Sequence, residues 1–105
     1  MTLLTMLPQT GTAGTVGTAQ IIGTNTTVIN LQFNPQLNVG FTGSLVVEGS
    51  NVATPGANDW ILLVTGIFTA QTSNVSINMN TSITWLRVRL PSGSTSGAIS
   101  AYASF

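Results

Sequence analysis

The chain contains no cysteine, no histidine and no lysine, and four of its 105 residues carry a charge. Without cysteine it can form neither a disulfide nor a thiolate metal site. Without histidine and cysteine it also lacks the commonest general base and the strongest side-chain nucleophile of enzymes. Calcium sites usually draw on several carboxylates, whereas this sequence offers Glu48 and Asp59 alone. We therefore expect no metal, no cofactor and no catalytic residue.

The two carboxylates are the remaining residues that could support an enzymatic activity. Glu48 and Asp59 lie on either side of a loop over residues 50–58, and a pair of carboxylates is what glycosidases use. The charged groups and the surplus of polar aromatic residues that hold a sugar are missing, so we expect a non-enzymatic protein. The alternative roles of the two carboxylates are solvation, or ion pairs with Arg87 and Arg89 at a subunit contact.

The scarcity of charge also limits the choice of partners. An average soluble domain has about a quarter of its residues charged, against 4% here, and Thr, Ser, Asn and Gln supply the polarity instead. A neutral surface gives no long-range repulsion, which favours self-association; the alternative is a monomer kept soluble by its hydroxyl groups. Two arginines at zero net charge cannot support binding to nucleic acid. No apolar run approaches the roughly 20 residues of a membrane-spanning helix, so we expect no membrane partner.

Residues 1–17 differ from the rest of the chain. An apolar tip of Leu3, Leu4, Met6 and Leu7 is followed by glycines at positions 11, 14 and 17. Glycine at this density favours an extended segment over a helix. We predict an extended N-terminal arm over residues 1–17, which orders against another chain, and a domain over residues 18–105. The alternative is a first edge strand with a frayed end.

From residue 18 onward the sequence has the features of β-strands: β-branched residues, alternation with period two, and Gly, Pro and Asn between the runs. The runs cover residues 18–23, 26–33, 41–49, 59–65 (continuing to 70 past a bulge), 73–80, 82–90 and 97–105, with a tight turn at Thr24-Asn25. The almost wholly apolar run 59–65 indicates a strand covered on both faces. About seven or eight strands with short turns predict a single antiparallel β-sandwich of jelly-roll or immunoglobulin-like topology.

The run 82–90 carries the sharpest surface hypothesis. Strict alternation places Thr84, Leu86, Val88 and Leu90 on one face of the strand and Ile83, Trp85, Arg87 and Arg89 on the other. If the leucine and valine face is the core, a Trp-Arg-Arg stripe faces outward, and Trp and Arg are enriched in interface hot spots. The alternative is that Trp85 caps the core while the arginine stems cover apolar surface.

Residues 41–105 resemble a pattern that is common in small β-sandwich proteins among bacteriophage structural proteins. The resemblance is carried by Gly43-Ser-Leu-Val-Val-Glu-Gly-Ser50, by Asp59-Trp60 after a variable loop, by Ile83-Thr-Trp-Leu-Arg-Val-Arg89 and by Ser96-Gly-Ala-Ile-Ser-Ala-Tyr-Ala103. It implies a virion protein, above all a capsid decoration or cement protein. Such a protein is commonly a homotrimer on the outer surface of the capsid, where it clamps neighbouring subunits of the major capsid protein.

In such a protein the apolar tip and the stripe would contact the other subunits: Leu3, Leu4, Met6, Leu7, Trp85, Arg87 and Arg89. Full burial would stabilise docking by roughly 1.5–3 kcal/mol for each apolar side chain of the tip. One alternative is a tail, fibre or baseplate component, although repeats and a coiled-coil stem are missing. Another is a carbohydrate-binding module, for which Trp60, Trp85 and Tyr102 would supply aromatic surface from different segments.

Overall fold

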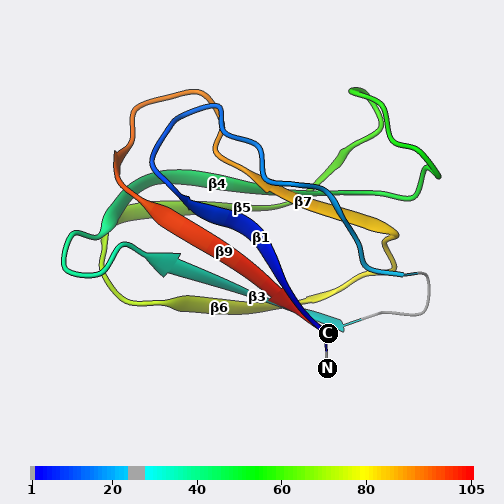
Figure 1. Cartoon of the computed structure of the whole chain (residues 1–105), viewed down its shortest axis with the longest axis horizontal. Helices are drawn as coiled ribbons and strands as arrows, with labels where there is room; N and C mark the ends of the chain where they lie inside the picture. Colours follow the sequence, from blue (N-terminus) through cyan, green and yellow to red (C-terminus); the bar gives the residue numbers. More distant parts are fainter. Residues whose placement is uncertain (1, 24–27) are drawn as a thin grey trace.

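The computed structural model describes residues 2–23 and 28–105, and in these ranges the chain forms strands and no helix (Figure 1). The turn predicted at Thr24-Asn25 lies outside the described residues. The strands are β1 (Leu3–Thr10), β2 (Gln20–Ile21), β3 (Val28–Pro35), β4 (Phe41–Ser50), β5 (Ile61–Gln71), β6 (Val75–Asn80), β7 (Trp85–Arg89), β8 (Ser96–Gly97) and β9 (Ile99–Ser104). The prediction of an all-β chain is confirmed.

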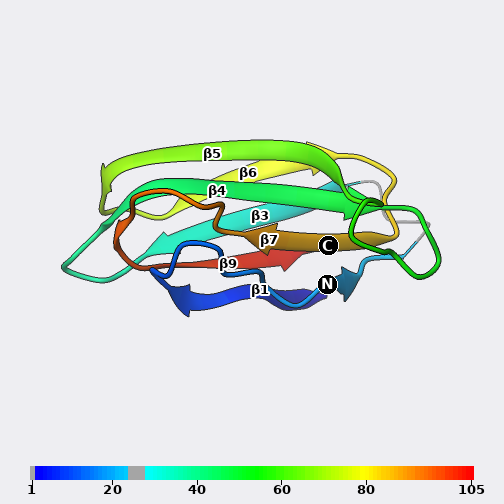
Figure 2. The same ribbon diagram turned by 90° about the horizontal axis from the view of Figure 1, so that it is seen from above.

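The strands form two antiparallel sheets that pack face to face. One sheet has the order β1-β9-β3-β6 and the other β2-β7-β4-β5, with the short β8 paired to β4. Figure 1 shows β1, β9, β3 and β6 side by side, and Figure 2 shows the strands running along the length of the molecule. The first long strand therefore lies beside the last one in one sheet.

This strand order distinguishes between the two predicted topologies. In the constant-type immunoglobulin fold the first and last strands belong to different sheets. Here they are neighbours, and with β8 set aside the chain crosses between the sheets in the double Greek-key order of a jelly roll. The predicted β-sandwich is thus confirmed, and its connections are those of the jelly-roll alternative.

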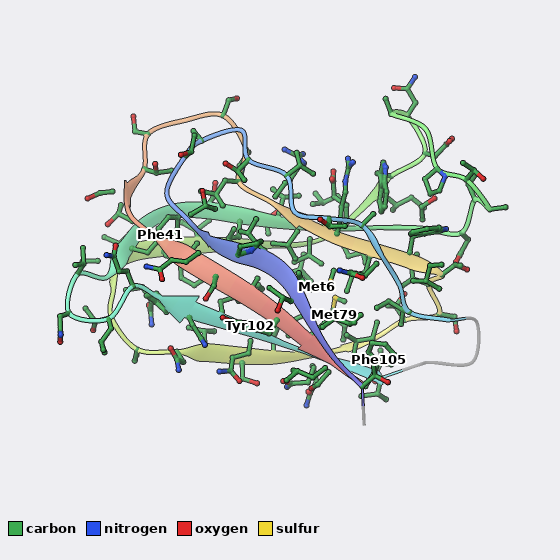
Figure 3. The ribbon with its side chains drawn as sticks, viewed as in Figure 1. Met6, Phe41, Met79, Tyr102 and Phe105 are labelled. Atoms are coloured by element: carbon green, nitrogen blue, oxygen red, sulfur yellow. The ribbon has the colours of Figure 1, made fainter. Side chains whose placement is uncertain are left out.

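The core lies between the two sheets and follows the predicted alternation. Ile29, Leu31 and Phe33 of β3 are buried on one face, and Phe41, Leu45 and Val47 of β4 are buried opposite them. Met79 of β6 and the inward residues of β9 complete the layer (Figure 3). The Phe68 ring of β5 packs edge-on against two core rings, with centroids 6.0 Å from those of Phe33 and of Phe41.

The N-terminal segment departs from the prediction of an arm. Leu3–Thr10 is β1, the edge strand that pairs with β9, and Met6 and Leu7 are fully buried in the core. The segment after it is also attached, because the Gly14 and Gly17 amides donate to the carbonyls of Leu90 and Val88. Burial of two large apolar side chains outweighs the flexibility that the glycines allow. The alternative of a first edge strand is therefore the correct one.

The apolar run 59–65 also departs from the prediction. It forms the first part of β5, which is an edge strand, and Ile61 and Leu62 are exposed. Its continuation to about residue 70 is confirmed, with bulges where the β4–β5 register shifts. A continuous apolar run is typical of a strand with neighbours on both sides and cover on both faces, and here one side of the strand is open.

Candidate functional site

The predicted stripe on β7 faces outward from the sandwich. Leu86 and Val88 are fully buried in the core, while Trp85, Arg87 and Arg89 are half-buried on the opposite face. The prediction is wrong for Ile83, which is buried in the core against Gly49. The strand begins only at Trp85, so strict alternation does not extend back to Ile83.

Glu48 lies at the centre of this outer face. The register of β4 against β7 places Glu48 directly opposite Arg87 and Val46 opposite Arg89. The Arg87 Nε donates to Glu48 Oε1 at 2.8 Å, and the Arg89 Nε donates to the same oxygen at 3.0 Å. The Arg89 Nη2 lies 3.3 Å from Glu48 Oε2. One carboxylate thus fixes both arginines within the chain, which confirms the predicted pairing, while the subunit contact suggested with it stays a prediction.

The indole of Trp60, the residue before β5, completes the cluster. The Arg87 Cζ lies 4.2 Å from the centre of the Trp60 ring, a cation–π distance. The neighbouring Asp59 turns away to the β4–β5 loop, where its Oδ2 accepts the Gly56 amide at 2.7 Å. The two carboxylates of the chain therefore have separate partners. We call Glu48, Trp60, Trp85, Arg87 and Arg89 the outer-face cluster.

The electrostatics of the cluster are set by competing effects on Glu48. Burial of its side chain raises the pKa, while hydrogen bonds and charge from Arg89 and Arg87 lower it more strongly, so the pKa lies below its ordinary value. Glu48 is therefore ionised at neutral pH. A carboxylate held in this way is a structural anion and is poorly suited to donate or accept the proton of a reaction.

Exposed apolar side chains border the outer-face cluster on three strand segments. Val16 bridges to Arg89, Ile21 lies opposite Trp85, and Leu62 lies opposite Glu48. All three are exposed in the sandwich. Sequence analysis did not identify them, because no short pattern shows that residues 16, 21 and 62 surround a site. Their positions follow from the pairing of strands distant in sequence.

The structure separates the two halves of the predicted interface. Met6 and Leu7 are core residues, Leu4 packs against the core, and only Leu3 is exposed. They belong to β1 in the sheet opposite the one that carries Trp85, Arg87 and Arg89. The outer-face cluster is thus the one concentration of the predicted side chains that remains available to a partner.

Residues 2–23 and 28–105 contain neither a metal-binding cluster nor a helix that could span a membrane. No three acidic, histidine or cysteine side chains gather in these ranges, and no helix there is long and apolar enough to cross a membrane. Comparison of the chain with protein-family models, with curated proteins and with solved structures finds no match.

Proposed function

We propose that the chain is a structural protein of a bacteriophage particle, of the capsid decoration or cement type, which binds capsid subunits on the outer surface of the head. The observation that carries the proposal is the outer-face cluster, a preorganised Trp-Arg surface with an apolar border. The jelly roll supports it, because this architecture is used in viral capsids. The scarcity of charge supports it as well, since such a surface associates readily.

The cluster has the chemistry of a protein-binding hot spot. Trp and Arg are enriched at the energetic centres of interfaces, where surrounding contacts exclude water. Each guanidinium has five N–H donors, and Glu48 takes only one from Arg87 and two from Arg89. The remaining donors are free for carbonyl, amide or carboxylate groups of a capsid subunit.

The arginines are also held in place before a partner arrives. Glu48 fixes both, and the Trp60 ring supports Arg87 from one face. A side chain that is already ordered loses little conformational entropy when it binds. With two guanidinium groups and one carboxylate the cluster carries a net positive charge, so it favours an acidic or carbonyl-rich surface on the capsid subunit.

The test is binding of the purified chain to heads of the phage whose genome encodes it, prepared without the chain. Ile21 is 61% exposed beside Trp85, and Val28 is 54% exposed in the other sheet. Ile21→Glu should weaken head binding at least about tenfold, because it places a negative charge against the acidic or carbonyl-rich surface that the cluster favours. Val28→Glu adds the same charge elsewhere and should bind as the unchanged protein does.

Two results would count against the proposal. One is equal binding of the Ile21→Glu and Val28→Glu variants, which would place the contact elsewhere on the molecule. The other is a chain that does not bind heads but binds a glycan through Trp85 or Tyr102, which would favour a carbohydrate-binding module. Cosedimentation with heads and a glycan screen on the same preparation separate these results.

A further inference from the structure

The open side of β5 is the most unusual backbone surface of the molecule. β5 has 11 residues, Ile61–Gln71, and in the described part of the chain it pairs with β4 alone. The strand contains neither proline nor a charged residue. Ile61, Leu62 and Ile67 on it are exposed. A long, apolar, unpaired edge is a template for another strand, and proteins usually protect such edges.

The other three sheet edges have this protection. β1 carries the exposed Pro8 and two register shifts, β2 has only two residues, and β6 is short with the exposed polar residues Ser76, Asn78 and Asn80. Proline, bulges, short length and polar side chains are the usual means of blocking edge pairing. β5 also has two register shifts, but it lacks proline, is the longest of the four edge strands and exposes large apolar side chains, which indicates an edge that is used.

We propose that β5 pairs with β5 of a second copy of this chain, antiparallel and about a two-fold axis, so that two sheets join into one. The other edges of a second copy are blocked, whereas an antiparallel strand is complementary to itself across a two-fold axis. Between its two bulges, β5 pairs regularly with β4 from Val64 to Phe68. With the two-fold axis at Gly66, the centre of this segment, the longest regular stretches of the two copies pair with each other.

This register places suitable side chains opposite each other. Thr65 of one copy would face Ile67 of the other on the outer face, and β-branched pairs of this kind stabilise antiparallel sheets. Gly66 would face Gly66 at the axis, where the absence of side chains allows close approach of the two backbones. No charge lies on β5, so the two copies meet without repulsion.

The size of the contact sets the expected strength. A strand of 11 residues is about 37 Å long, close to the 38 Å length of the molecule. A strip of that length and about 10–17 Å wide covers about 400–600 Å² on each copy. Specific interfaces begin near about 1,000 Å² in total. We therefore expect a reversible dimer that forms at tens of micromolar and dissociates near about 1 μM.

The experiment is light scattering coupled to size exclusion, from about 1 to about 200 μM protein, on the unchanged chain and two lysine variants. Ile67 is 81% exposed on β5, and Leu37 is 83% exposed in the β3–β4 loop, so the two sites are matched in exposure and in added charge. Ile67→Lys should weaken the dimer at least about tenfold, because lysine on an edge strand blocks pairing. Leu37→Lys should leave the dimer unchanged.

Three outcomes would overturn the proposal: a monomer at every concentration, the trimer implied by the family resemblance, or a dimer equally strong in both variants. Thr65→Lys provides a second block if Ile67→Lys does not fold, as judged by its thermal unfolding beside that of Leu37→Lys. Hydrogen exchange of the residue 64–68 amides should slow with protein concentration. The dimer does not rest on the capsid role, since head binding is tested through Ile21 and dimerisation through Ile67.

Discussion

At the scale of single residues, Glu48 determines the form of the outer face. Its carboxylate accepts hydrogen bonds from Arg87 and Arg89 of β7, which follow Glu48 in the chain by 39 and 41 residues. Without it, two guanidinium groups would lie side by side with no counter-charge. The ion pairs are therefore part of the binding surface and part of the fold at once, and a substitution at Glu48 should affect both.

Replacing Glu48 by Gln tests the contribution of this carboxylate to stability. The variant keeps the shape of the side chain and removes the charge, so both arginines lose a partner at a largely buried position. We expect the free energy of unfolding to fall by about 1–2 kcal/mol, less than for a fully buried pair because the arginines remain partly solvated. Urea unfolding measures the change. Asp59→Asn, at the Gly56 amide, is the control, and a similar loss there would remove the special role of Glu48.

The same residue gives the stability a defined pH dependence. Because the pKa of Glu48 is lowered in the folded chain, its contribution is fully present above the ordinary value of 4.5 and is lost as the pH falls through the lowered value. The melting temperature of the unchanged chain should therefore fall more steeply between pH 6 and pH 3 than that of Glu48→Gln. The remaining carboxylates are common to both proteins. Parallel pH profiles would show that Glu48 is equally easy to protonate in both states.

At the scale of elements, β1 is an integral strand of the sandwich. It pairs with β9 and contributes Met6 and Leu7 to the core. The segment behind it approaches closely as well, since a side chain at Gly17 would collide with the Met6 and Val88 carbonyl oxygens. β1 and the segment up to residue 17 thus form the border of the core on one side of the molecule.

Deletion of residues 1–10 should therefore unfold the protein. The deletion removes β1, so β9 loses one of its two hydrogen-bonded neighbours. It also removes two fully buried side chains, each worth about 2–5 kcal/mol in substitutions to alanine. That loss is comparable to the total stability of a small domain. Circular dichroism and amide dispersion in NMR spectra measure the outcome. A folded deletion product would restore the interpretation of residues 1–17 as an arm.

The sequence predicts strand faces better than strand neighbours. Period two correctly placed Leu86 and Val88 in the core and Arg87 and Arg89 outside, because each assignment depends on a few adjacent residues. The pairing of β4 with β7, which brings Glu48 to the arginines, depends on contacts between distant segments and leaves no local signal. For the same reason the exposed edge of β5 and the burial of β1 were missed.

At the scale of the whole molecule, the distribution of the few charges distinguishes the proposed dimer contact from the proposed capsid contact. The proposed β5 contact contains no ionised group, whereas the outer-face cluster is the most charged surface of the chain. Salt screens interactions between charges over about 8–10 Å at physiological ionic strength. The two contacts should therefore respond differently to salt.

Raising the salt concentration from about 50 to about 500 mM should change the dissociation constant of the dimer by less than about threefold. Binding to phage heads should weaken over the same range, because the arginines contribute through charge. Light scattering and cosedimentation at both salt concentrations measure the two quantities. A strongly salt-dependent dimer would point to a contact through the arginines, and a salt-independent head contact would point away from them.

The hydrogen bonds at the ends of the chain have a further consequence. The Thr2 amide donates to the Phe105 carbonyl, and the Phe105 amide donates at 3.0 Å to the Thr2 carbonyl, so the two ends lie together (Figure 1). A short linker could join them into a ring, and new ends could be opened in the exposed loop at residues 51–58. A circular permutant of this kind should keep the same two sheets. It would move the points of genetic fusion from the β1–β9 pair in one sheet to the loop that joins β4 and β5 in the other sheet.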